Sequence, residues 1–338
     1  MVTQDEADTT RSAILASFVP QPSSESTATP DTPNWPAILA SLAGYWYYEV
    51  PPRRVWDSTE PMMLRLGYDI QFDLPGTVAM MALLNVHPSR AGELRAPDEL
   101  RVEPTTPVES FIDTFGNRCT RFLAQRGSLR LSNSTLLEDP GLPDPVNWAA
   151  RELPVQELPN QVLPYLLNSR YCEVDRFSMI AGELFGGIAP GWGRVQAICD
   201  WVNIKVSFGY QYARPTKTAL DVYSERYGVC RDFQHLAVTL CRALHIPARY
   251  ATGYLGDIRV PASATPMDFS AWFEAYLEDR WWTFDARNNY PRHGRVLMAT
   301  GRDASDVAIT TSFGMANLTH FTVISEEVTE ESAHSEHG

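Results

Sequence analysis

The feature that most constrains the fold is one long amphipathic segment, CRDFQHLAVTLCRALHIPARY, which begins at Cys230. Apolar residues at positions 230, 233, 237, 240, 241 and 244 recur at helical spacing, so the segment predicts a helix with one buried face. The pattern ends before Pro247, because a helix does not easily continue through proline. Gly228 allows a sharp loop before the segment, which predicts that Cys230 stands in the first turn of the helix.

Strand patterns follow this predicted helix, and further helix patterns precede it. ARYATGYL and SAWFEAYL are typical of strands, and a short turn at residues 278–280 leads into WWTFDA. Upstream, residues 175–185 and the segment RVQAICDWVNI have helical periodicity. Helices followed by an antiparallel sheet define an α+β unit, which we expect over residues 156–325.

The chain before this unit has the alternation of half-buried strands. In MMLRLGYDIQFDL, apolar residues from position 64 to position 74 alternate with polar residues or glycine, and GSLRLSNSTLL alternates in the same way. Gly116-Asn117 is a hairpin-turn pair between two such runs. We therefore predict an antiparallel, β-sandwich-like domain at residues 61–155.

Both ends of the chain have a different composition. Residues 1–33 are rich in Ser, Thr, Pro and acidic residues, so we expect a disordered extension. Residues 34–60 are aromatic and apolar, and we expect a short docked segment there. Residues 326–338 are predicted to form a solvated acidic tail.

Charge and cysteine content exclude several function classes. The net charge of −13 argues against nucleic-acid binding, which needs clustered Lys and Arg. No apolar run reaches the roughly 18 residues of a membrane helix, and the N-terminus lacks the order of a signal peptide. Five cysteines without a CxxC pair favour reduced thiols over disulfides or a zinc site. We expect a cytoplasmic protein without a cofactor, a metal ion, or a nucleic-acid or membrane partner; these patterns do not indicate the oligomeric state.

Cys230 is the cysteine best placed for chemistry. Backbone N–H groups and the helix dipole at a helix start stabilise an anion, which lowers a thiol pKa and can hold a developing oxyanion. The alternative is a structural cysteine on the apolar face of the helix, which the helical phase also fits. The remaining thiols are weaker candidates because none has the same glycine-loop context at a helix start: Cys119, Cys172, Cys199 and Cys241.

The segments GVCRDFQHLAVTLCRALHIPARYATGYL and DFSAWFEAYLEDRWWTFDARN together resemble the bacterial transglutaminase-like superfamily. The likeness extends over about residues 165–325, and the upstream strands resemble the β-domain that often precedes this core in bacteria. The resemblance implies a papain-like α+β core, with helices packed on an antiparallel sheet, and a Cys-His-Asp triad.

The family's site residues can be carried over one at a time. The nucleophile matches Cys230 in GVCRD, and the acid matches Asp285 in WTFDA. The histidine of the family motif HAW is replaced, because SAW puts Ser270 in that position. A serine hydroxyl does not act as a base near neutral pH. Asp285 would then have no imidazole to orient, and we expect it to pair with an arginine, such as Arg231 or Arg287.

Other residues are candidates for supporting roles. His293 lies on a loop after Asp285 and is a candidate substitute base, whereas His235 should point away from Cys230 on the helix. Asp232 is either a cap of the helix or a catalytic acid. Tyr212, or its neighbour Tyr210, is a candidate second donor to the oxyanion.

These observations support three hypotheses. The first is a thiol hydrolase or acyltransferase that acts on amide bonds of a peptide or protein substrate through a cysteine acyl-enzyme. The second is a catalytically impaired protein that uses the same cleft to bind a peptide or partner. The third is altered chemistry in a subfamily in which Ser270 is tolerated.

Overall fold

From residue 62 to residue 139 the chain is built mainly of strands, as the period-two patterns predicted. The structure is a computed structural model that describes residues 60–263 and 266–328. The predictions for residues 1–33 and 34–60 fall outside the described residues, apart from Glu60. The elements up to residue 139 are β1 (Met62–Leu74), β2 (Val78–Ala82), the short 3-10 helix η1 (Pro88–Glu93), β3 (Arg101–Glu103), β4 (Val108–Ile112), β5 (Arg118–Ala124) and β6 (Gly127–Asp139).

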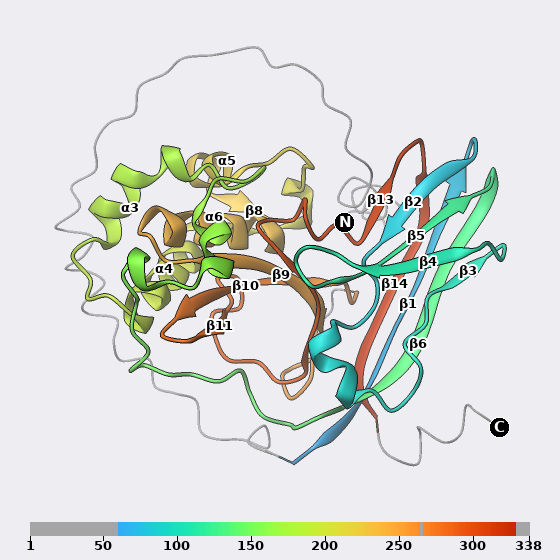
Figure 1. The fold of residues 1–338 in the computed structure, drawn as a ribbon, viewed down its shortest axis with the longest axis horizontal. Coiled ribbons are helices and arrows are strands. Elements are labelled where there is room, and N and C mark those ends of the chain that lie inside the picture. Colours follow the sequence, from blue (N-terminus) through green and yellow to red (C-terminus); the bar gives the residue numbers. More distant parts are fainter. Residues whose placement is uncertain (1–59, 264–265, 329–338) are drawn as a thin grey trace, which may run out of the picture. The chain divides into compact units, whose positions relative to one another are not determined.

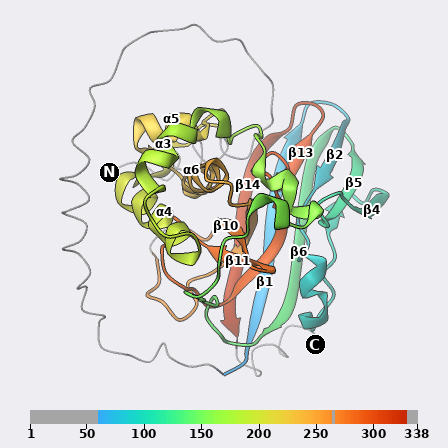
Figure 2. The same cartoon turned by 60° about the vertical axis from the view of Figure 1, so that its left-hand side comes forward.

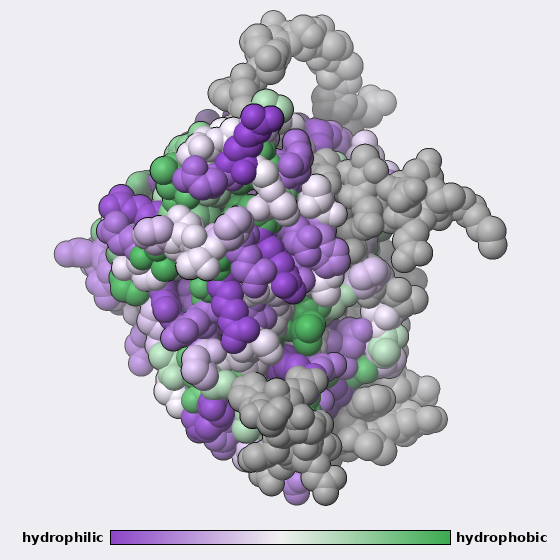
Figure 3. Space-filling view, turned by 90° about the vertical axis from the view of Figure 1, so that its right-hand side faces the viewer, coloured by the Kyte–Doolittle hydropathy of each residue, from purple (hydrophilic) through white to green (hydrophobic). Residues whose placement is uncertain are grey.

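These strands form two antiparallel sheets together with two later strands, β13 (Thr310–Ser312) and β14 (Asn317–Val328). The strand orders are β14-β1-β6-β3 and β13-β2-β5-β4. Strands β1 and β6 pair along their whole length, from Met62↔Asp139 to Leu74↔Gly127. Apolar residues of both sheets meet in one buried cluster, so the predicted β-sandwich is present. The face on the sandwich side of the molecule is largely hydrophilic, which fits strands whose alternate residues face water (Figure 3).

Two of the sandwich strands come from the far end of the chain. β13 (Thr310–Ser312) pairs with β2, and β14 (Asn317–Val328) pairs with β1 from Met63↔Val328 to Asp73↔Asn317 (Figure 1). The boundary expected at residue 325 therefore falls inside β14. The sequence did not indicate this because the pairing joins segments at opposite ends of the described chain.

Between these strands lies the α+β unit. It begins with 3-10 turns and the helices α3 (Ser178–Phe185) and α4 (Trp192–Lys205), then β7 (Ser207–Phe208), the 3-10 turn η5 (Tyr210–Tyr212), α5 (Ala219–Glu225) and β8 (Tyr227–Gly228). It continues with α6 (Cys230–Ala243) and a sheet of order β11-β10-β9-β12, made of β9 (Ala248–Leu255), β10 (Ser270–Leu277), β11 (Arg280–Phe284) and β12 (Arg295–Gly301). The helices predicted near residues 175–185, at RVQAICDWVNI and from Cys230 are confirmed.

The helices cover one face of this sheet, and the sandwich covers the other (Figures 1 and 2). Strand β10 contributes Phe273, Ala275 and Leu277 to the core beneath the helices. Strand β12 contributes Val296 and Met298 to the sandwich core. A sheet buried on both faces has near-continuous apolar strands, which explains why SAWFEAYL does not alternate strictly.

Candidate functional site

Cys230 is the first residue of α6 and the one cysteine of the described chain that is not classed as buried. Four of the five free cysteines are buried, whereas Cys230 is partly exposed. Every residue of α6 from Asp232 to Ala243 is buried, so the helix is anchored in the core and its first turn reaches the surface. The side chain packs beside Tyr250 and Ala271 in a small apolar cluster.

The loop before Cys230 is fixed by Asp232. The backbone N–H of Val229 donates to Asp232 Oδ2 over 3.0 Å, which caps the helix, and Arg231 donates to Oδ1 over 3.0–3.1 Å. A side chain at Gly228 would lie 2.8 Å from Oδ2, so glycine is required for this close approach. The capping interpretation of Asp232 is therefore confirmed.

The thiol of Cys230 is not activated in this arrangement. Burial, followed by the negative charge of Asp268, raises the pKa of Cys230 to about 11. The positive charge of Arg287 and the backbone N–H of Arg231 lower it, but by less. The expectation of a lowered thiol pKa at the helix start is therefore wrong, because burial outweighs the donors there.

Ser270 opens strand β10, next to the cluster that contains the thiol. It pairs with Gly253 of β9, and its carbonyl accepts a hydrogen bond from Thr252 Oγ1 over 3.0 Å. The next residue, Ala271, shares the apolar cluster of Cys230. The side chain of Ser270 is partly exposed, and its hydroxyl makes no recorded hydrogen bond to another residue in 60–263 or 266–328.

Asp285 follows β11 and is buried with both carboxylate oxygens occupied. Oδ1 accepts the backbone N–H groups of Arg287 and Asn288, each over 3.0 Å, and the side-chain amide of Gln234 over 3.1 Å. Oδ2 accepts Asn288 Nδ2 over 2.8 Å and Arg295 Nη2 over 3.3 Å. The acid is therefore held by a complete set of donors.

The counter-ion of Asp285 is Arg295. Burial alone would raise the pKa of Asp285, but the charge of Arg295 and the hydrogen bonds from Asn288 outweigh it and hold the pKa below its usual value. The expected partners were Arg231 and Arg287. Arg231 instead pairs with Asp232, and Arg287 contributes its backbone N–H rather than its guanidinium.

Arg295 is itself fixed by further contacts. It donates to both carboxylate oxygens of Asp144 over 3.0–3.1 Å, and its guanidinium lies 4.7 Å from the centre of the Trp272 ring. The sequence did not single out Arg295, because it lies 10 residues from Asp285 and Asp144 lies 151 residues from Arg295.

Gln234 was not identified from the sequence as a site residue, although its spacing of four residues from Cys230 places both residues on the same face of the helix. It lies one helical turn after Cys230, on α6, and is fully buried. Its amide nitrogen donates to Ala271 O and to Asp285 Oδ1, each over 3.1 Å, and its amide oxygen accepts the N–H of Ala286 over 3.2 Å. One side chain thus links the helix of the thiol to β10 and to the acid.

The two histidines considered beside Cys230 have different surroundings. His235 is buried, its ring stacks 4.7 Å from that of Tyr171, and its Nε2 accepts the N–H of Ala304 over 3.1 Å. Burial lowers the pKa of His235 to about 3, so this imidazole is neutral and faces the core, as predicted.

His293 remains a predicted substitute base. It lies in the loop before β12 and is partly exposed. Burial, and then the charge of Arg259, lower its pKa, and the acids that act on it are Asp139 and Asp144. The charged groups that act on the pKa of His293 are therefore different from those that act on the pKa of Cys230.

Tyr212 remains a predicted oxyanion donor. It ends the short turn η5, and its ring lies 4.3 Å from that of Tyr227, which precedes the Cys230 loop in β8. The two rings are tilted by 33° to each other, so the ring of Tyr212 packs beside the strand that leads into the Cys230 loop.

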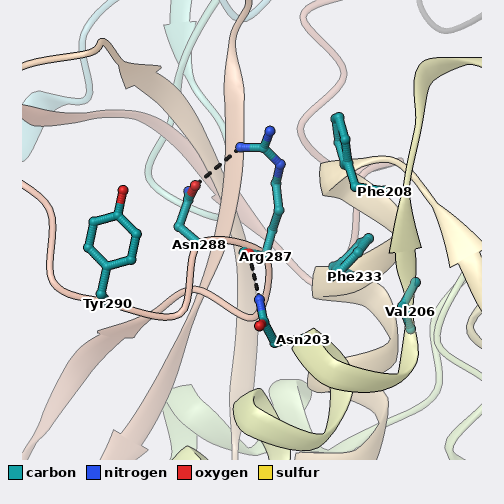
Figure 4. A pocket seen from close by; sticks show the side chains of 7 residues that line it. All are labelled: Asn203, Val206, Phe208, Phe233, Arg287, Asn288 and Tyr290. Carbon is teal, nitrogen blue, oxygen red and sulfur yellow. Dashed lines mark hydrogen bonds between the residues drawn. The ribbon is translucent and has the colours of Figure 1, made fainter. Parts of the chain in front are cut away.

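Two cavities flank the loop that carries Asp285. One has a volume of about 310 Å³ and lies between α4, β7, α6 and this loop; its lining includes Phe208, Phe233, Arg287 and Tyr290 (Figure 4). The other has a volume of about 380 Å³, and its lining includes Asp144, Asp285, Trp148 and Trp192. Two clefts therefore open beside the acid.

Across residues 60–263 and 266–328, no group of three or more His, Cys, Asp or Glu side chains has the arrangement of a metal site. None of the helices in the same part of the chain is long and apolar enough to span a bilayer.

Comparisons with known proteins agree with this fold. The family model described as the transglutaminase-like superfamily matches residues 178–286. A crystal structure from Cytophaga hutchinsonii, described as a "putative cysteine protease", is 31% identical, with a TM-score of 0.69 and coverage of 80% of this chain and 92% of that chain. An uncharacterised protein of Mycobacterium leprae is 27% identical over 218 residues, which are 62% of this chain and 77% of that protein.

Proposed function

Because this chain belongs to the transglutaminase-like superfamily, we propose that it is a thiol hydrolase or acyltransferase acting on amide bonds of a peptide or protein substrate through a cysteine acyl-enzyme. Cys230 is the proposed nucleophile, and Asp285 is the proposed acid of the site. The observation that carries this proposal is the position of Cys230, a partly exposed residue at the start of a helix that is buried from Asp232 onward.

In the proposed reaction, the deprotonated sulfur of Cys230 attacks the amide carbonyl carbon. A carbon–sulfur bond forms, and the carbonyl oxygen takes the negative charge. Backbone N–H groups at the start of α6 are the proposed donors to that oxygen. The amine leaves with a proton from water in the cleft, and water or a second amine then removes the acyl group and restores the thiol.

Ionisation of the thiol limits this reaction. Because the pKa of Cys230 is about 11, the thiol is protonated at neutral pH, and Ser270 is not a base that could take its proton. The role proposed for Asp285, with Gln234 and Arg295, is to fix the position of the loop after β11 relative to the first turn of α6. In this role Asp285 does not orient an imidazole. Turnover is therefore expected to be slow at neutral pH and to rise with pH.

A second candidate is a peptide- or partner-binding protein without turnover. Its support is the resemblance of SAW to the family motif HAW, which predicts that Ser270 replaces the histidine, together with the pairing of Asp285 with Arg295. In both candidates the peptide or partner binds beside Cys230. They differ in whether an acyl group becomes attached to Cys230.

The proposed compartment is the cytoplasm of a bacterium. The support for it is that all five cysteines are free thiols in the structure, as is usual in a reducing environment. The proposed partner is the peptide or protein substrate itself.

Acylation by 4-nitrophenyl acetate tests the proposed function. This ester transfers its acetyl group to a thiolate and releases coloured 4-nitrophenolate, so both the rate and the labelled residue can be measured. We expect acetyl-Cys230, identified by mass spectrometry, to form faster as the pH rises from about 7 to about 10.5. The Cys230→Ala variant is the control. Absence of the label on Cys230 at the highest pH would leave the binding protein as the better description.

A further inference from the structure

The smaller cavity beside the Asp285 loop combines aromatic walls with one cation. Its lining contains three rings and two side-chain amides, and Arg287 is its charged residue (Figure 4). The groups used below are Asn203, Phe208, Phe233, Arg287, Asn288 and Tyr290. A concave, mostly apolar site with a few placed polar groups is the usual form of a ligand pocket.

The guanidinium of Arg287 has no carboxylate partner among the described residues. Its side chain makes one recorded hydrogen bond, from Nη1 to Asn288 Oδ1 over 3.2 Å, and stacks 4.2 Å from the centre of the Phe208 ring. The buried arginines near the site differ, because Arg231 pairs with Asp232 and Arg295 pairs with Asp285. Within residues 60–263 and 266–328, the charge of Arg287 is therefore not neutralised by a carboxylate.

The backbone of Arg287 is held by hydrogen bonds on both sides of the peptide chain, so the side chain extends from a fixed position. Its N–H donates to Asp285 Oδ1 over 3.0 Å, and its carbonyl accepts Asn203 Nδ2 over 2.7 Å. A site residue whose main chain is anchored on both sides loses less conformational freedom on binding.

The cavity lies beside the first turn of α6, which begins at Cys230. Phe233, in its wall, lies one helical turn after Cys230 on α6, and the charge of Arg287 acts on the thiol. A substrate whose scissile carbonyl lies at Cys230 thus has a neighbouring group within reach of this cavity.

We propose that this cavity binds a carboxylate-bearing group of the substrate, with the N–H edge of Arg287 donating to the carboxylate and the rings of Phe208, Phe233 and Tyr290 covering its apolar stem. Arginine fits a planar carboxylate because its N–H groups form a rigid fork. The carboxylate is either an acidic side chain or the C-terminus of a peptide. This assignment rests on the proposed function for the position of the substrate.

The second cavity is a poorer site for such a group. Its lining contains the carboxylates of Asp144 and Asp285, and both are already paired with Arg295. The cavity of Arg287 contains no acidic residue in its lining. Like charges repel, so an anionic group is directed to the cavity lined by Arg287.

Equilibrium binding of matched peptides tests the proposal. The full chain carrying Cys230→Ala is titrated with an acetylated tripeptide ending in glutamate amide and with its glutamine twin, by isothermal titration calorimetry. A second pair compares a trialanine peptide with a free carboxylate and the same peptide as an amide. We expect at least one acidic probe to bind about tenfold more tightly than its neutral twin.

The Arg287→Gln variant, in the same background, is expected to bring that ratio to about one, and Arg287→Lys, which keeps the charge without the planar fork, to give an intermediate ratio. Arg280→Gln is the matched control, because Arg280 is an exposed arginine 4.4 Å from the Trp282 ring, and it should keep the full preference. The pair that shows the preference identifies the source of the carboxylate.

The proposal is overturned if neither acidic probe binds more tightly than its twin, or if the preference survives in both Arg287 variants. Because Cys230→Ala has no nucleophile, these ratios do not depend on acylation. A cysteine that fails to become acylated would remove the proposed reaction while leaving the anion site testable, so the two failures are distinguishable.

Discussion

Gln234 donates a hydrogen bond to Asp285 over 3.1 Å, and the two residues come from different layers of the molecule. Gln234 lies on α6, one turn from Cys230, and Asp285 follows strand β11. The same amide nitrogen reaches Ala271 O of β10 over 3.1 Å. The relative position of thiol and acid therefore depends on a side chain outside the family's triad.

Replacing Gln234 by alanine should destabilise the fold. The variant leaves the N–H of Ala286 and the carbonyl of Ala271 without this buried partner and opens a cavity, so we expect a loss of about 2–4 kcal/mol in the free energy of unfolding. Urea denaturation followed by tryptophan fluorescence measures it. Gln71→Ala is the matched control, because Gln71 is only partly buried and bonds to Asp69 on the same strand; its loss should be below about 1 kcal/mol. Equal losses in both variants would contradict this role for Gln234.

The Asp285–Arg295 pair should make stability depend on acid pH. The native pKa of Asp285 lies below its ordinary value near 3.9, so the charged form contributes stability above about pH 3.9, and that contribution is lost as the pH falls through the native pKa. We expect the difference in unfolding free energy between wild type and Asp285→Asn to shrink as the pH falls from about 7 to about 2. Urea titrations across that range provide the measurement, and a constant difference would exclude the pair as its source.

Alkylation of Cys230 should follow an alkaline titration. With a pKa of about 11, about 0.1% of the thiol is ionised at pH 8, so its reaction with iodoacetamide should rise almost tenfold per pH unit up to about pH 10. The rate is measured by mass spectrometry of the peptide that contains Cys230, with Cys230→Ser as the blank. A midpoint below about 8.5 would mean that the thiol is activated after all.

Introducing an imidazole should restore base catalysis. In Ser270→His, the new side chain stands at the start of β10 beside the cluster of Cys230. General base catalysis typically raises a rate about 10²–10⁴-fold, so the rate of acylation by 4-nitrophenyl acetate at pH 7 should rise at least about 100-fold. The pH profile of this rate should also show the ionisation of the new imidazole near pH 6.5.

Ser270→Ala is the control for that experiment. It removes the hydroxyl without adding a base, so the rate at pH 7 should change by no more than about twofold. If the acylation rate of Ser270→His equals that of Ser270→Ala while both variants remain folded, a base at position 270 does not act on Cys230.

The sequence predicted the elements whose signals are local. The apolar spacing from Cys230 onward and the glycine at 228 were enough to predict α6 and the position of the thiol in its first turn. The resemblance to the family motif predicted Asp285 as the acid and Ser270 in place of the histidine, and both assignments stay predictions. These predictions needed only residues that lie close together along the chain or in a known motif.

The sequence did not predict the contacts that depend on packing. Strands β11 and β12 are opposite edges of their sheet, and Arg295 becomes the counter-ion of Asp285 because the end of β11 and the start of β12 lie at the same end of that sheet. The other partner of Arg295, Asp144, comes from a distant connector. The thiol pKa depends on how deeply Cys230 is buried, which the helix pattern leaves open. A helix start alone suggested a lowered pKa, and the surrounding atoms reverse it.

The pairing of β14 with β1 also affects the order in which the chain can fold. Leu64 lies opposite Glu327, so a protein made from its N-terminus exposes one edge of β1 until almost the whole described chain has been synthesised. Closing so long a loop is slow, and an unpaired edge invites association with other chains. A ribosome that stalls within the α+β unit would therefore leave an incomplete sheet, and the nascent chain would depend on a chaperone to cover it.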